Sequence, residues 1–118
     1  MTVLAQPTFA SAAALSPREE AAYPFLECAV LLDNARKSEP AIQLADALDV
    51  NALRWQTVAN RALGRNRDLP HGTADFFGRA SRFMVEAART MRQRPDDDVI
   101  DMMISMNLNM SETILTAR

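Results

Sequence analysis

The stretch SEPAIQLADALDVNALRWQTVANRALG, residues 38–64, decides the fold. Ser38 is followed by Glu39 and Pro40, and serine is a favoured cap of a helix whose first turn accepts proline. Apolar residues then recur at intervals of three and four, which places them on one face of a helix. This stripe consists of Leu44, Ala45, Leu48, Ala52, Trp55, Ala59 and Ala62. Gly64 is a natural stop, so the sequence predicts one helix with one buried face.

A second helix is predicted before this stretch. Ser16, Pro17 and Glu19 form the pattern of a capping box, with serine as the cap and proline at the first helical position. The helix is expected to run to about Lys37. Pro24 lies inside it, where a proline loses a backbone hydrogen bond, so we expect a kink there or a helix start near Tyr23. The predicted apolar face consists of Ala22, Phe25, Leu26, Ala29, Leu32 and Ala35.

Two more helices are predicted after the loop of residues 64–72. The first begins near Thr73 and ends before Pro95. Its apolar face consists of Phe76, Phe77, Ala80, Phe83, Met84, Ala87 and Met91. The second begins at the acidic residues 96–98, because negative charge is favourable at a helix N-terminus. Its apolar face consists of Ile100, Met103, Ile104, Asn107, Met110 and Ile114.

These elements define the fold class. No segment alternates apolar and polar residues for long enough to form a strand, and short connections join the helices. The sequence therefore predicts an all-α protein, a small four-helix bundle over residues 16–118. Residues 1–15 are small and lack periodicity, so we expect a flexible, disordered N-terminal tail. A chain of 118 residues is long enough to bury a single core without disulfides or metals.

The chain is poorly supplied with catalytic and metal-binding side chains. His71 is the only histidine and lies in a Pro-His-Gly loop, where we expect an exposed turn residue. Cys28 is the only cysteine, and its apolar neighbours indicate a buried side chain. One histidine and one cysteine cannot make a zinc site, and the acidic run of residues 96–101 lacks the spacing of a calcium loop. We therefore expect no catalytic, cofactor-binding or metal-binding residues and no enzymatic activity.

The location of the protein follows from its N-terminal residues and its single thiol. Residues 1–17 lack the basic residue that opens a secretory signal, and they are too rich in alanine, serine, threonine and proline to span a membrane. A lone cysteine makes no internal disulfide, as is usual in a reducing compartment. We expect a cytoplasmic protein without a membrane segment.

Charge is distributed unevenly along the chain. The net charge is −2, but residues 1–50 carry −4, residues 51–95 carry +6 and residues 96–118 carry −4. Several arginines of the third helix fall opposite its phenylalanines, an arrangement typical of a solvated face. A surface that binds RNA is the alternative interpretation of the basic region, although direct nucleic-acid binding is not the expected one.

Methionine and asparagine are the informative residues of the last helix. Met102, Met103, Met106 and Met110 cover more than one of its faces. Methionine adapts to irregular apolar partners, so these residues form either core or a contact surface. Asn107 lies on the apolar face, where an amide must find hydrogen bonds, and Asn51 on the second helix has a similar position one turn before Trp55.

Several segments, in this order and spacing, resemble the flagellar biosynthesis regulator FlaF family of alphaproteobacteria. The resemblance spans roughly residues 16–116. It is carried by Ser16-Pro17-Arg18-Glu19 with Tyr23 and Phe25, Ala47-Leu48-Asp49-Val50-Asn51 with Trp55, Asn66 with Leu69-Pro70, Ala80-Ser81-Arg82-Phe83-Met84, and Met103-Ile104-Ser105-Met106-Asn107 with Met110 and Ile114.

The resemblance implies a non-enzymatic protein that promotes flagellin synthesis and secretion. It implies flagellin as the partner, bound in the manner of a secretion chaperone, and a FlbT-like regulator as a second partner. We expect Trp55, Met102, Met106 and Met110 to contact a partner helix. The alternative is a post-transcriptional regulator that binds flagellin messenger RNA or acts with an RNA regulator.

Overall fold

The computed structural model describes residues 14–38, 42–64 and 71–116. These residues form four α-helices and contain no strand, which confirms the all-α fold class. The helices are α2 (Pro17–Arg36), α3 (Ile42–Gly64), α4 (His71–Gln93) and α5 (Asp97–Thr116). Most of the predicted tail, residues 1–13, lies outside the described residues.

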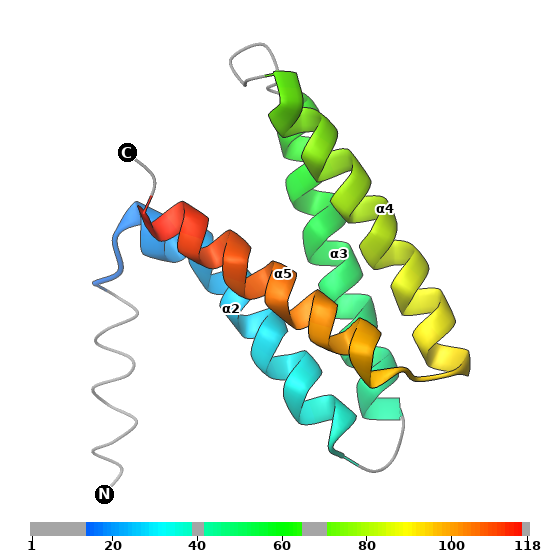
Figure 1. Cartoon of the computed structure of the whole chain (residues 1–118). Coiled ribbons are helices and arrows are strands. Elements are labelled where there is room, and N and C mark those ends of the chain that lie inside the picture. Colours follow the sequence, from blue (N-terminus) through cyan, green and yellow to red (C-terminus); the bar gives the residue numbers. More distant parts are fainter. Residues whose placement is uncertain (1–13, 39–41, 65–70, 117–118) are drawn as a thin grey trace, which may run out of the picture.

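The four helices form two side-by-side pairs (Figure 1). Helix α5 packs along α2, α4 packs along α3, and α2 also packs against α3. The two pairs converge where α2 ends and α3 begins, and they diverge toward the opposite ends of these helices. The molecule measures 44 × 41 × 19 Å, so it is about two helices thick, since a helix with its side chains is about 10 Å across.

The start of α2 confirms the predicted capping box. The Ser16 hydroxyl accepts a hydrogen bond from the Glu19 backbone N–H at 3.1 Å, and the Ser16 N–H donates to the Glu19 carboxylate at 2.8 Å. The helix continues through Pro24, so the alternative start near Tyr23 is wrong. One interior proline removes a single backbone hydrogen bond, and the packed turns on both sides keep the segment helical.

The other helix boundaries lie close to their predicted positions. Helix α4 begins at His71, two residues before the expected Thr73, so His71 is a helical residue and not a loop residue. Residues 39–41, which follow the predicted cap Ser38, lie outside the described part of the chain. The acidic start of α5 is confirmed, because the Asp96 carboxylate accepts a hydrogen bond from the Asp98 N–H at 2.9 Å.

Most of the predicted apolar faces are buried. The largest fully buried side chains include Trp55, Leu32, Leu48, Met84, Ile100 and Met103. The Phe25 ring meets Trp55 edge to face, with ring centroids 5.2 Å apart. Leu26 and Phe76 are exceptions, because they are 37% and 41% exposed. Leu26 lies at the edge of the α2 stripe, and Phe76 packs edge to face on Phe77 with its outer side in solvent.

A buried hydrogen-bond network joins three helices inside this core. Asn51 and Trp55 of α3 and Asn107 of α5 are fully buried. The Trp55 indole N–H donates to the Asn107 side-chain oxygen at 3.0 Å, and the Asn107 amide donates to the Asn51 oxygen at 2.8 Å. The Asn51 amide in turn donates to the Met84 sulfur of α4 at 3.1 Å. Both asparagines thus find the hydrogen bonds that the sequence indicates they need.

Replacement of Asn107 by alanine is expected to destabilise the fold by about 2–4 kcal/mol, because it leaves the Trp55 N–H and the Asn51 oxygen buried without partners. Asn109→Ala is the matched control, since Asn109 is an exposed residue of the same helix. It is expected to change stability by less than about 0.5 kcal/mol. Urea unfolding followed by circular dichroism measures both, and equal losses would contradict the role of the network.

Candidate partner-binding groove

An apolar groove opens between the first half of α2 and the middle of α3. It has a volume of about 630 Å³. It is lined by Glu20, Ala21, Pro24 and Phe25 of α2, by Val50, Leu53, Arg54, Thr57, Val58 and Arg61 of α3, and by Ile114 of α5. Leu53 is 63% exposed, the largest value among the exposed large hydrophobic side chains. The groove therefore presents an accessible apolar surface.

The lining of α3 comes from a second face of that helix. Val50, Leu53, Thr57 and Arg61 are spaced by three or four residues, so they lie in one row. This row is displaced around the helix from the stripe that contains Trp55. The groove thus exists because α3 carries apolar residues on a face that the neighbouring helices cover only in part. The stripe predicted from the sequence leaves this row out, although the three-residue spacing of Val50 and Leu53 is a signal of it.

The polar groups of the groove carry opposite charges on its two sides. Glu20 lies on the α2 side, whereas Arg54 and Arg61 lie on the α3 side. Arg54 also forms an ion pair with Glu27 of α2 at 3.1 Å. Both side chains of this pair are partly exposed, so the pair contributes at most about 1 kcal/mol to stability.

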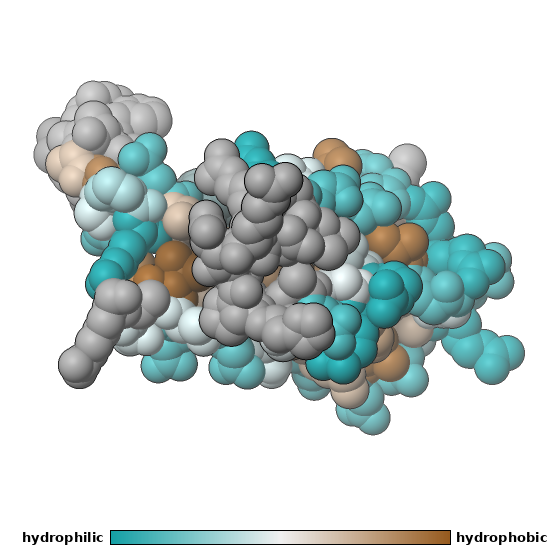
Figure 2. Space-filling view, turned by 90° about the horizontal axis from the view of Figure 1, so that it is seen from above, coloured by the Kyte–Doolittle hydropathy of each residue, from teal (hydrophilic) through white to brown (hydrophobic). Residues whose placement is uncertain are grey.

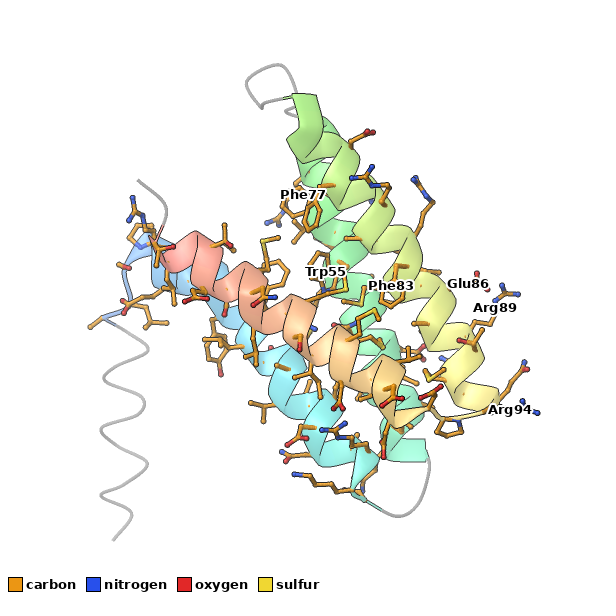
Figure 3. All side chains as sticks on the ribbon, viewed as in Figure 1. Trp55, Phe77, Phe83, Glu86, Arg89 and Arg94 are labelled. Atoms are coloured by element: carbon orange, nitrogen blue, oxygen red, sulfur yellow. The ribbon has the colours of Figure 1, made fainter. Side chains whose placement is uncertain are left out.

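Further ion pairs lie outside the groove, and one of them joins the basic middle region to the acidic residues 1–50. Arg92 pairs with Asp49, and Arg36 pairs with Asp101 and with Asp33. Hydrogen bonds from Lys37 and Arg36 lower the pKa of Asp33. Figure 3 shows Glu86 and Arg89 of α4, and Arg94 directly after its end, projecting away from Phe83. The arginine side of α4 is therefore a solvated face with carboxylates beside it.

The four residues expected to contact a partner have different positions in the structure. Trp55 is fully buried and hydrogen-bonded to Asn107, so it belongs to the core and is not a contact surface in this fold. Met106 and Met110 are half-buried and pack against the core, whereas Met102 is 53% exposed. In Figure 3, Trp55 lies between α5 and the α3–α4 pair. None of the four lines the groove.

Hydrophobic side chains reach the surface at several places besides the groove. Figure 2 shows such patches among hydrophilic residues on the face seen from above. The most exposed ones outside the groove are Tyr23 and Val30 of α2 and Met102 and Leu108 of α5. They are scattered over the outer sides of these helices. The groove differs from them because its apolar side chains surround a hollow.

Within the described ranges, no group of three histidine, cysteine or acidic residues is placed to hold a metal ion, and no helix is long and apolar enough to cross a membrane. No family model matches the sequence, and no curated protein and no solved structure is significantly similar to it.

Cys28 lies in the core beside the groove. It is fully buried, and this burial raises the pKa of its thiol from 9.0 to about 11, against an opposing effect of Arg54. The thiol is therefore uncharged at neutral pH. A neutral, buried thiol is a poor nucleophile, because the thiolate is the reactive form.

Cys28 is expected to react with Ellman's reagent at pH 8 at least about a hundredfold more slowly in the folded protein than in urea, because burial and the raised pKa both lower the accessible thiolate. The thiol ionises at about pH 9 in the unfolded protein and only near pH 11 in the folded protein. Ionisation therefore favours the unfolded state, and the free energy of unfolding falls as the pH rises from 9 to 11. Equal rates in folded and unfolded protein would contradict the buried position.

Proposed function

We propose that this chain is a non-enzymatic, cytoplasmic regulator of flagellum biogenesis that promotes flagellin synthesis and secretion. In this proposal it binds flagellin as a chaperone-like helical module, and a FlbT-like regulator is a second partner. The groove between α2 and α3 is the observation that carries the proposal, together with the FlaF-like order of the sequence segments.

The physical basis is the binding of an amphipathic helix in an apolar groove. Flagellin termini form such helices and expose an apolar face before they assemble. Burial of that face against Leu53, Val50 and Val58 is favourable by roughly 25 cal/mol for each Å² of apolar surface. A bound helix is shielded from aggregation and from premature assembly. The proposed chaperone action follows from this shielding.

The ion pairs of the arginines favour a protein partner over RNA. Arg54, Arg89 and Arg92 each lie against a carboxylate of this chain. An RNA phosphate would have to replace that carboxylate and approach its negative charge. Binding of the flagellin leader RNA at low salt, weakening steeply as salt is added, would support the RNA alternative instead.

Flagellin is expected to co-purify with the tagged protein from motile cells, and Leu53→Asp is expected to reduce its recovery at least about tenfold. The substitution places a charge in the apolar groove at an exposed position, so the fold is retained. Leu108→Asp is the matched control, because Leu108 is an exposed leucine on α5 outside the groove lining. It is expected to leave flagellin recovery unchanged.

Met102→Asp distinguishes between two candidate contact surfaces, the groove and the methionines of α5. If recovery falls with Met102→Asp and not with Leu53→Asp, the contact surface lies on α5 and the groove is not the site. If abundant wild-type protein recovers no flagellin, direct binding of flagellin fails. Circular dichroism of each variant confirms that a lost partner does not reflect a lost fold.

A further inference from the structure

The charged groups that line the groove differ between its two sides. On the α3 side, Arg54 and Arg61 are cationic donors that lie two helical turns apart, about 10 Å along the axis. On the α2 side, the exposed carboxylate of Glu20 is an acceptor.

The occupant of such a groove needs two different edges. A helix lying in it presents its apolar stripe to Leu53 and Val58, with one edge of the stripe toward α3 and the other toward α2. Acidic side chains on the first edge would meet Arg54 and Arg61. Basic or amide side chains on the second edge would meet Glu20. A helix with two acidic edges or two basic edges leaves one side of the groove facing a like charge.

We propose that the groove selects an amphipathic helix whose apolar stripe is flanked by one acidic and one basic edge. This inference rests on the proposed use of the groove for a partner helix. The order of the two edges also fixes the direction of the bound helix. If the helix is rotated by 180° about the axis perpendicular to the groove floor, it runs in the opposite direction and its two edges change sides. Arg54 can exchange its ion pair with Glu27 for one with the bound helix, since both side chains of the present pair are partly exposed.

Three synthetic 18-residue peptides with the same leucine stripe test the selection by fluorescence anisotropy. The first has one glutamate edge and one lysine edge, the second has two glutamate edges and the third has two lysine edges. Salt of about 0.15 M screens charges that lie more than about 8 Å away. The mixed peptide is expected to bind the wild-type protein roughly three- to tenfold more tightly than either of the others. This is the expected effect because the mixed peptide gains exposed ion pairs on both sides of the groove and avoids like charges.

Arg61→Glu is expected to move the preference to the peptide with two lysine edges. Arg79→Glu makes the same charge change at an exposed position of α4 outside the groove lining and is expected to keep the wild-type ranking. The proposal is overturned if no peptide binds, if the three bind equally, or if both variants change the ranking alike.

The two proposals fail in different ways. If the peptides rank as expected and flagellin is not recovered from cells, the edge selection stands and the flagellar function fails. If flagellin is recovered in a manner that depends on Leu53 while the peptides bind without ranking, the function stands and the edge selection is overturned.

Discussion

The indole N–H of Trp55 imposes the constraint on which the rest of the structure depends. An indole can only donate a hydrogen bond, and this one lies in a core without water access. The Asn107 oxygen accepts it, which turns the Asn107 amide toward the Asn51 oxygen and the Asn51 amide toward the sulfur of Met84. One donor thereby sets the orientation of every polar group in the network and fixes α5 and α4 against α3.

The same constraint explains the groove. The network turns the Trp55 face of α3 inward, toward α4, α5 and the Phe25 ring of α2, and this leaves the row that contains Leu53 at the surface. Helix α2 covers that row only partly, and its apolar side chains in the groove lining are Ala21, Pro24 and Phe25. The ion pair between Glu27 and Arg54 joins the two helices at the edge of the groove. The orientation of α3 about its own axis therefore has two results. It satisfies the buried polar groups of the core, and it leaves the groove residues accessible to a partner.

Local features of the fold could be predicted from the sequence, whereas features that depend on helix arrangement could not. The capping box at Ser16 and the stripe around Trp55 follow from spacing within one helix, and the buried amides of Asn51 and Asn107 follow from their place on apolar faces. Their pairing with each other spans 56 residues of sequence and required the structure. The sequence places Trp55 both in the buried stripe and among the expected partner contacts, because tryptophan is common in cores and in interfaces. The groove depends on how far α2 covers α3, which no single helix encodes.

A double-mutant cycle between Asn51 and Asn107 measures how strongly the buried network couples α3 to α5. The free energy of unfolding is measured for the wild type, Asn51→Ala, Asn107→Ala and the double variant. We expect the two single losses to add up to more than the double loss by about 1 kcal/mol or more, because removal of either amide already breaks the shared hydrogen bond. Losses that add within about 0.5 kcal/mol would show that the two residues act independently, which contradicts a network that holds α5 on α3.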